Sequence, residues 1–365
     1  MSLKIFAVGD IMLGGRPLCN NFGIKSLIHK TGSDFLFRDA SHLFDGGNIV
    51  FGNLECSIMN FNSNASEKTP FFCAEPDVIN GLKNSHFNVI SVANNHIMEN
   101  GKDIYLHTIR ILRNNGINAV GIRNKIEIIN IKNYKIAFLA YSFIEDYIPD
   151  VCYNKIQSAD AIIKDIKEVK PISDMIIISL HWGFEYIPYP SPNQIKIGRN
   201  LIDAGADIIL GAHPHVTQSY EIYKNRPIFY SLGNFIFDHT YIPTTADSFI
   251  AEINARDSLD SIDVDIIPVA IDKCDYHPQI MNSPQSNAFL KSVETIRGTF
   301  ESRSISNYSE SIGDYNRLYN QYKKNAKWNM KVHFVKNFYR YSRPTLIYIL
   351  KNYIGKHHLF SWIEL

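Results

Sequence analysis

Several short apolar runs in this chain end in side chains that can bind a metal ion. Asp10 follows FAVG, Glu55 follows IVFGNL, Asn95 and His96 close VISVANNH, His181 follows IIISL, and His213 and His215 follow DIILGA. Ligands in α/β proteins collect at the carboxyl ends of strands, where loops converge over a rigid sheet. One such residue alone is typical of a turn or of a hydrogen-bonded core histidine. Together they predict a shared site.

The residue types narrow the chemistry of this predicted site. Two carboxylates, an amide oxygen and three imidazoles without a thiolate suit borderline divalent ions such as Mn, Fe, Zn or Ni. A catalytic pair of ions needs a bridging carboxylate and open positions for water and substrate. Glu55 is the best candidate for the bridge, since Asp10 lies at the end of the first strand. The pattern therefore predicts two divalent metal ions, with Mn, Fe or Zn favoured.

The GAHPH segment is the most specific local signal. His213 and His215 are two residues apart, so an extended backbone would point them to opposite sides, and Pro214 between them restricts the turn. Each imidazole could then reach a different ion.

Other interpretations of these motifs compete with a metal site. NNH is also typical of a turn, HWG of an aromatic core element built on Trp182, and GDIMLGG of a loose phosphate loop that lacks the usual glycine spacing. The sequence contains no GxSxG motif, which disfavours serine catalysis.

Apolar runs of strand length alternate with helical patterns along the chain. We expect buried strands at 3–9, 48–53, 88–94, 134–142, 174–180, 206–212 and 226–234, and helices at 76–85, 102–115, 155–169 and 193–204. This alternation predicts an α/β fold with largely buried strands. Residues 248–272 indicate two further strands joined by a polar turn.

The size, charge and cysteine content of the chain indicate the broad class of protein. A chain of 365 residues that is 45% hydrophobic can bury a large core, and its net charge of +1 does not favour nucleic-acid binding. The five scattered cysteines indicate reduced thiols, and the N-terminal apolar run is too short to span a bilayer. We expect a cytoplasmic protein.

The C-terminal segment differs from the rest of the chain. Residues 317–365 carry a net charge of +9, so the preceding 316 residues carry −8 of the chain's total of +1. Helical spacing places Trp328, Val332, Val335 and Tyr339 near one face, with Lys327, Lys331 and Lys336 around it. Three interpretations stay open: a helix packed on the core with a solvated basic face, peripheral contact with the inner face of a membrane, or binding of an acidic polymer.

Seven motifs in order make the sequence similar to the CapA family of bacterial capsule and poly-γ-glutamate synthesis proteins. That family resembles the calcineurin-like metallophosphoesterases. The motifs are GDIMLGG (9–15), GNLECSI (52–58), FFCAEPDVINGL (71–82), SVANNHIMENG (91–101), HWGFEY (181–186), GAHPHV (211–216) and SLGNFIFD (231–238). The resemblance implies a four-layer α/β/β/α sandwich of two mixed β-sheets, which we expect over residues 1–285. The charge and helical spacing of the C-terminal segment add a basic helical extension, which we expect over residues 286–365.

The resemblance also implies a role for each predicted site residue. Asp10 and His215 would hold the first metal, Glu55 would bridge, and Asn95, His181 and His213 would hold the second. His96 would protonate the leaving group, for which its ordinary pKa is suited. Two positions depart from the wider superfamily: Met12 stands where a metal-binding histidine is usual, and Glu99 stands where an aspartate usually orients the catalytic histidine.

The expected function is that of a metal-dependent hydrolase of capsule or surface-polymer biosynthesis, acting on a phosphoester or related bond. Its expected partner is an acidic or phosphorylated surface-polymer precursor, and no nucleic acid is expected. The alternative is a non-catalytic protein that binds polymer or phosphate within a capsule assembly complex. Arg16, Lys68, Glu185 and Tyr186 lie in loops that could contact substrate, although each is also typical of a protein surface.

Overall fold

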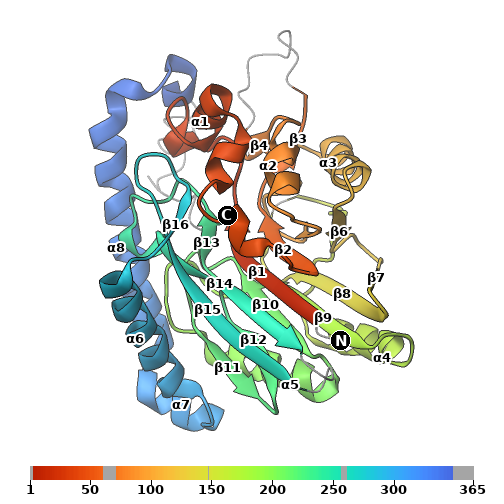
Figure 1. Cartoon of the computed structure of the whole chain (residues 1–365). Helices are drawn as coiled ribbons and strands as arrows, with labels where there is room; N and C mark the ends of the chain where they lie inside the picture. Colours follow the sequence, from red (N-terminus) through yellow and green to blue (C-terminus); the bar gives the residue numbers. More distant parts are fainter. Residues whose placement is uncertain (1–2, 61–70, 147, 256–260, 348–365) are drawn as a thin grey trace.

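The computed structural model describes residues 3–60, 71–146, 148–255 and 261–347, and its described strands form two large sheets and one small one (Figure 1). The larger sheet has the order β16-β15-β14-β1-β2-β5-β6, with β13 pairing beside β1. Its strands are β1 (Leu3–Ile11), β2 (Ile49–Leu54), β5 (Val89–Ser91), β6 (Asn118–Val120), β13 (Asn234–Ile236), β14 (Asp247–Ala255), β15 (Ile262–Ile271) and β16 (Pro278–Ile280). Strands β1, β2, β5 and β6 are parallel, and β14, β15 and β16 extend the sheet antiparallel.

The second large sheet has the order β11-β12-β10-β9-β8-β7 and is also mixed. Its strands are β7 (Glu127–Ile131), β8 (Tyr134–Ser142), β9 (Met175–His181), β10 (Ile208–Ala212), β11 (Tyr220–Tyr223) and β12 (Arg226–Phe229). The four central strands are parallel and β7 and β11 close the edges antiparallel. The small sheet pairs β3 (Ser57–Ile58) with β4 (Cys73–Ala74).

The two large sheets pack face to face, and strand β9 shows why its sequence is apolar throughout. Met175 and Ile177 belong to the core between the sheets, whereas Ile176 and Ile178 belong to a separate core on the outer face. Successive strand residues point to opposite faces, so a strand buried on both sides has no polar alternation. The rings of Phe51 on β2 and Phe138 on β8 stack across the interface with centroids 6.4 Å apart.

Helices cover the outer faces of both sheets, which confirms the expected α/β/β/α sandwich. Helices α4 and α5 pack on the second sheet, and α1 and α2 lie on the other side of the molecule near the first sheet (Figure 1). The helices are α1 (Ile24–Thr31), α2 (Val78–Asn84), α3 (Lys102–Asn114), α4 (Asp160–Val169), α5 (Pro192–Ala204), α6 (Ser283–Phe300), α7 (Ile305–Ile312) and α8 (Tyr315–Asn337). Most strand and helix predictions agree, but α4 begins at Asp160 rather than near 155. The polar turn predicted between β14 and β15 includes residues 256–260, which lie outside the described residues.

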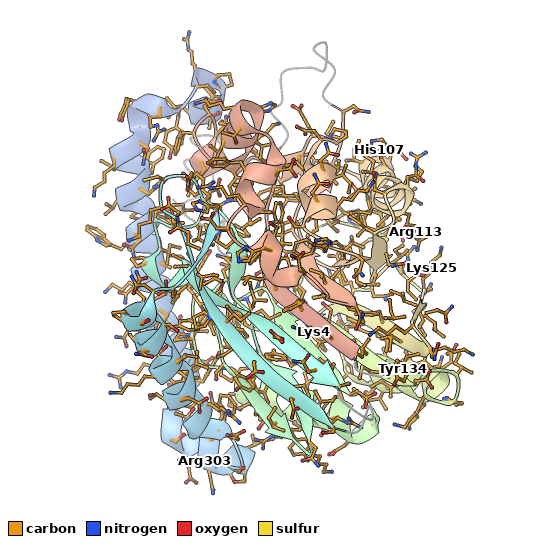
Figure 2. All side chains as sticks on the ribbon, in the orientation of Figure 1. Lys4, His107, Arg113, Lys125, Tyr134 and Arg303 are labelled. Carbon is orange, nitrogen blue, oxygen red and sulfur yellow. The ribbon has the colours of Figure 1, made fainter. Side chains whose placement is uncertain are left out.

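Helices α6, α7 and α8 follow the sheets and lie along one side of the molecule (Figure 1). Phe289 and Val293 of α6 belong to the main core, so this helix packs tightly on the sheets. Arg303, between α6 and α7, lies at the margin of the molecule in Figure 2. Where the structure describes the chain, no helix is both long enough and apolar enough to cross a bilayer.

The face of α8 that packs on the protein is not the one suggested by its aromatic residues. Ala326 and Met330 are buried, whereas Trp328 and Val335 are 66% and 72% exposed. The apolar stripe predicted from the sequence therefore faces outward.

Candidate metal centre

Three neighbouring strands of the larger sheet bring the first carboxylate to its place. Asp10 lies near the end of β1, where it pairs in register with Asn53 of β2 and Asn234 of β13. The preceding residue must be glycine, because a Cβ on Gly9 would lie 1.8 Å from the carbonyl oxygen of Gly233. That carbonyl accepts the backbone N–H of Asp10 at 2.9 Å and holds the strand end in position.

Asp10 and Glu55 form a fully buried pair of carboxylates. Asn53 Nδ2 donates to Asp10 Oδ1 at 2.8 Å and to Glu55 Oε1 at 3.2 Å. Burial and the nearby charge of Asp10 raise the pKa of Glu55 well above its usual value. Burial also acts to raise the pKa of Asp10, but its hydrogen bond and charge interaction with His215 outweigh this effect and lower it. The other oxygen of Glu55, Oε2, is buried and has no hydrogen-bond partner among the described residues.

His181, at the end of β9, faces these carboxylates from the second sheet. Its Nδ1 lies 3.6 Å from Glu55 Oε1, and its Nε2 lies 2.9 Å from the amide oxygen Oδ1 of Asn95. Burial, followed by the charges of His213 and His215, lowers the pKa of His181 well below its usual value. This imidazole is therefore neutral near pH 7.

The segment after β10 turns sharply and directs both of its histidines to the same site. His213 and His215 have φ angles of 97° and 58°, so the backbone is left-handed rather than extended at both positions. Their ring centroids are 6.0 Å apart, and that of His213 lies 4.7 Å from His181. Burial and the charge of His215 lower the pKa of His213 to about 3. The left-handed turn thus replaces the extended arrangement that would have separated the two side chains.

His215 has one ring nitrogen held by the protein and the other directed at Glu55. Its Nδ1 lies 2.9 Å from Asn234 Oδ1 and 3.2 Å from Asp10 Oδ2, and its Nε2 lies 3.9 Å from the unpartnered Glu55 Oε2. Burial alone would lower the pKa of His215, but the hydrogen bond and charge of Asp10 raise it above its usual value.

His96 lies beside this cluster. Its Nδ1 hydrogen-bonds to Glu99 Oε1 at 2.6 Å, and its ring stacks on Phe72 with centroids 4.2 Å apart. Its other nitrogen, Nε2, is 3.4 Å from Asn95 Nδ2. The carboxylate of Glu99 therefore contacts Nδ1 of His96 and can orient the ring, the role expected of an aspartate at this position.

The structure brings all of the predicted residues into one buried cluster, and their chemistry fits divalent metal ions. Oxygen and nitrogen ligand atoms of Asp10, Glu55 and His181 lie within 4.8 Å of one another. Two buried carboxylates with an unpartnered oxygen need a positive charge, and neutral imidazoles offer lone pairs. The thioether of Met12 is completely buried and offers only a soft sulfur ligand at the position where a histidine is usual.

Three asparagines complete the cluster and were missed in the sequence analysis. Asn53 joins both carboxylates, Asn234 holds His215, and Asn94 Nδ2 donates to Asn53 Oδ1 at 3.2 Å and to the Leu54 carbonyl at 2.8 Å. All three are completely or almost completely buried. Their signal was present in GNLE, NNH and LGNF, since an asparagine within a buried strand end needs specific partners.

The loop residues considered as substrate contacts are not ordinary surface residues. Arg16, Glu185 and Tyr186 are all buried, and Arg16 Nε donates to Asp238 Oδ1 at 2.5 Å. Burial raises the pKa of Glu185, whose Oε2 finds no hydrogen-bond partner in the part of the chain that the structure describes. Lys68, the fourth of these residues, lies outside the described residues.

A further histidine, His239, also lies at the site without having been predicted. Its ring centroid is 5.2 Å from that of His215, and no described residue hydrogen-bonds to its buried Nδ1. Glu185 and His239 therefore leave two unsatisfied polar atoms beside the metal-ligand cluster.

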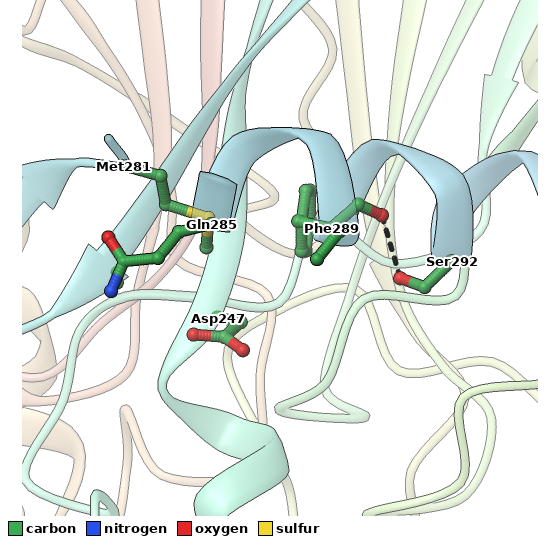
Figure 3. Close-up of a pocket in the computed structure, with 7 residues that line it drawn as sticks. Asp247, Met281, Gln285, Phe289 and Ser292 are labelled. Carbon is green, nitrogen blue, oxygen red and sulfur yellow. Dashed lines mark hydrogen bonds between the residues drawn. The ribbon is translucent and has the colours of Figure 1, made fainter. Parts of the chain in front are cut away.

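Two other polar features lie apart from this cluster. A hollow of about 330 Å³ between α6 and the adjoining strands contains Asp247 and Gln285 but none of the predicted ligands (Figure 3). Asp272, Asp275 and His277 also form a group with metal-ligand spacing, but Arg38 Nη2 lies 3.0 Å from Asp275 Oδ2. The guanidinium already supplies a positive charge there, so this group is a weaker metal candidate.

Comparisons with known proteins agree with these motifs. Residues 4–239 match the family described as bacterial capsule synthesis protein PGA_cap. The chain is similar to the capsule biosynthesis protein CapA of Bacillus anthracis, with 30% identity over 288 residues that cover 74% of this chain and 67% of that protein. It is also similar to the PGA biosynthesis protein CapA of Bacillus subtilis strain 168, with 29% identity over 261 residues that cover 68% of this chain and 67% of that protein.

Among solved structures, a phosphatase from Mycoplasma pneumoniae aligns with a TM-score of 0.49 and 12% identity, over 74% of this chain and 94% of its own. A putative 5'-nucleotidase from Staphylococcus aureus aligns with a TM-score of 0.45 and 12% identity, over 81% of this chain and 58% of its own.

Proposed function

Because this chain belongs to the PGA_cap family of bacterial capsule synthesis proteins, we propose that it is a metal-dependent hydrolase that acts on a precursor of a capsule or poly-γ-glutamate polymer. The reaction that suits the site best is phosphoester hydrolysis or a related transfer at a phosphoryl or acyl centre. The proposed substrate is an acidic or phosphorylated precursor of the surface polymer. The observation that carries the proposal is the buried convergence of Asp10, Glu55 and three histidines, with Glu55 Oε2 left without a partner.

The proposed roles follow from how each side chain is held. Asp10 and His215 would hold one divalent ion, Asn95, His181 and His213 would hold a second, and Glu55 would bridge the two. When bound, such ions acidify water and stabilise negative charge that develops on the substrate. His181 and His213 are suited to bind them because their lowered pKa values leave both imidazoles unprotonated near pH 7.

His96 is the proposed proton donor to the leaving group. Glu99 accepts a hydrogen bond from Nδ1 of His96, which leaves Nε2 to face the cluster. Phe72 packs flat on the ring and restricts its rotation. Glu185 and His239 offer unpartnered polar atoms next to the cluster, and we assign them to substrate binding.

One observation favours a second candidate function. Met12 is completely buried at the position where the metallophosphoesterases have a metal-binding histidine, so the residues present would offer the first ion fewer ligands than the second. The alternative is a non-catalytic member of a capsule assembly complex that binds polymer or phosphate at this cluster. All five cysteines are free, which supports a cytoplasmic location in either case.

Metal content and turnover test both candidates. Elemental analysis of the purified protein should give close to two equivalents of Mn, Fe or Zn, and the loaded protein should hydrolyse an aryl phosphate monoester or diester. His96→Ala should keep the metal and lose about 100-fold or more of the rate, whereas His86→Ala, at an exposed position, should change neither.

Each outcome separates the candidates. One equivalent of metal or none, without turnover, supports the binding protein and rejects the hydrolase. Two equivalents without turnover of any phosphoester, or of a γ-glutamyl anilide as an acyl substrate, reject catalysis at this site.

A further inference from the structure

Within the part of the chain that the structure describes, the buried residues of helix α8 lie on one side of the helix. Ala326 and Met330 are buried against Leu18, Tyr186 and Ile242. One turn further along, His333 Nε2 lies 3.1 Å from the carbonyl oxygen of Leu18. These residues define the inner face of α8, and the rest of the helix lies along the margin of the molecule (Figure 1).

The opposite side of α8 combines large apolar side chains with lysines. Lys324, Trp328, Lys331 and Val335 are spaced at four, three and four residues, so they form one stripe, and all four are exposed. Trp328 is 66% exposed and Val335 is 72% exposed. This stripe, which we call the outer face of α8, is neither a purely charged solvated surface nor a packed core face.

The outer face continues beyond the end of the helix and adjoins a basic hollow. Phe338 and Tyr339, in the short turn after α8, are 51% and 83% exposed. Lysines and asparagines on α8 surround a hollow of about 440 Å³ beside Trp328. Residues 315–347 contain eight lysines and arginines and no aspartate or glutamate. The positive charge is therefore concentrated on one side of a chain whose remaining part is acidic.

We propose that the outer face of α8 docks onto the surface of an anionic lipid bilayer. Tryptophan and tyrosine favour the membrane–water interface, where the ring is in contact with acyl chains and the polar atom stays in water. Lysine stems lie along the apolar surface while their ammonium groups reach lipid phosphates. Such a helix lies in the plane of the interface and does not span the membrane.

Charge complementarity alone would also suit a soluble polyanion, but the apolar residues favour the bilayer. A soluble polyanion gains little from Val335, Phe338 and Tyr339, because most of its contacts are made to charged groups in water. A bilayer surface buries these side chains and attracts the surrounding lysines at the same time. The apolar and the basic side chains therefore both contribute to docking on a bilayer.

Docking through this face would bring the metal centre close to the bilayer. On its other side, α8 contacts the loop that follows β9, where the rings of Tyr319 and Phe184 have centroids 4.7 Å apart. Burial raises the pKa of the next residue, Glu185, and Lys323 on α8 lies near enough for its positive charge to act in the opposite direction. An α-helix is about 10–12 Å across with its side chains, so this loop would lie within roughly one helix diameter of the lipid headgroups.

Vesicle co-sedimentation of the full chain tests the proposal independently of any catalytic activity. Wild type should bind vesicles of phosphatidylcholine with 30% phosphatidylglycerol at least ~10-fold more strongly than vesicles of phosphatidylcholine alone. Trp328→Ser with Val335→Ser, and separately Lys324→Glu with Lys331→Glu, should each reduce binding about ten-fold. The matched controls are Leu106→Ser with Ile172→Ser, and Lys30→Glu with Lys83→Glu, which change exposed or partly exposed residues elsewhere and should bind like wild type.

Several results would overturn the proposal. Wild type that does not bind, or binds both kinds of vesicle equally, excludes docking on anionic lipid. Loss of binding in the lysine variant alone, with the Trp328 and Val335 variant unchanged, indicates a general polyanion surface. A marked fall in the thermal unfolding temperature of the Trp328 and Val335 variant would show that this face is covered within the protein.

Discussion

His96 Nδ1 lies 2.6 Å from Glu99 Oε1, three residues further along the chain, and this contact fixes which ring nitrogen faces the metal-ligand cluster. The Nδ1–H of the ring donates to the carboxylate, so Nε2 is directed towards Asn95. The pair therefore fixes the orientation of the His96 ring.

Replacing Glu99 by Gln should weaken catalysis without removing the metal. An amide can donate to Nδ1 as well as accept from it, so it no longer holds the ring in one tautomer, and the rate of aryl phosphate hydrolysis should fall by about 10- to 100-fold. Glu99→Asp should restore part of the rate. A rate equal to that of wild type would exclude a role for Glu99.

Replacing Asn53 by Ala should lower metal affinity by about 10- to 100-fold, because Asn53 Nδ2 holds both Asp10 and Glu55 in place. Isothermal titration of the metal-free protein with Mn²⁺ or Zn²⁺ measures this change. Asn80→Ala, at an exposed position on α2, is the matched control and should bind metal like wild type. Unchanged affinity in Asn53→Ala would show that the carboxylates need no support from this amide.

Replacing Arg199 by Met should destabilise the fold at the junction of α5 and α6. Arg199 makes two hydrogen bonds to Glu221, which is almost completely buried, and donates to the carbonyl of Phe300 at the end of α6. Its loss leaves a buried carboxylate without a counter-charge, which costs about 3–5 kcal/mol of unfolding free energy. Urea denaturation measures the change. Arg303→Met, which removes an exposed guanidinium, should alter the unfolding free energy by about 0.5 kcal/mol at most.

Stability should decline in mildly acidic solution, partly because of His333 on α8. Burial, together with the charge of Arg16, lowers its pKa below the usual 6.5 in the folded protein. Below pH 6.5 the unfolded chain therefore binds a proton more readily than the folded chain, so the contribution of His333 to stability is present above this pH and is lost as the pH falls.

The His333→Asn variant isolates this effect. Its unfolding free energy should fall less steeply than that of wild type between pH 7 and the lowered pKa of His333, as measured by denaturant titration at each pH. His86→Asn, at an exposed position, should follow the wild-type curve. If His333→Asn also follows the wild-type curve, His333 does not contribute to the acid dependence.

Much of the fold and of the cluster could be predicted from local patterns. An apolar run such as IIISL in β9 can be buried on both faces only within a sheet that is covered on both sides, so the α/β class follows from the sequence. The same runs end in oxygen and imidazole side chains, and parallel strands bring such ends to one edge. For this reason Asp10, Glu55, Asn95, His96, His181, His213 and His215 could be identified as neighbours before their contacts were known. Their binding of metal and their part in catalysis stay predictions.

Contacts between segments that are distant in the sequence decided the remaining features of the fold and of the cluster, because side chains acquire partners only when strands and helices pack. The register that places Asp10 between Asn53 and Asn234 depends on pairing among three strands. The left-handed turn at His213 and His215 depends on the packing around β10, where Cβ on Gly211 would meet the Tyr230 carbonyl at 2.1 Å.

Helix α8 shows the same division between sequence and tertiary structure. Its sequence carries apolar side chains on two sides, and helical periodicity placed Trp328 and Val335 on one face without deciding whether that face packs on the core. The core instead accepts the side with Ala326 and Met330, where smaller or more flexible side chains fit against Leu18 and Tyr186. Composition and periodicity thus determined that a basic, aromatic helix would form here. Only tertiary packing decided which face it would leave exposed. Packing requires two surfaces of complementary shape, and the sequence of the helix specifies only one of them.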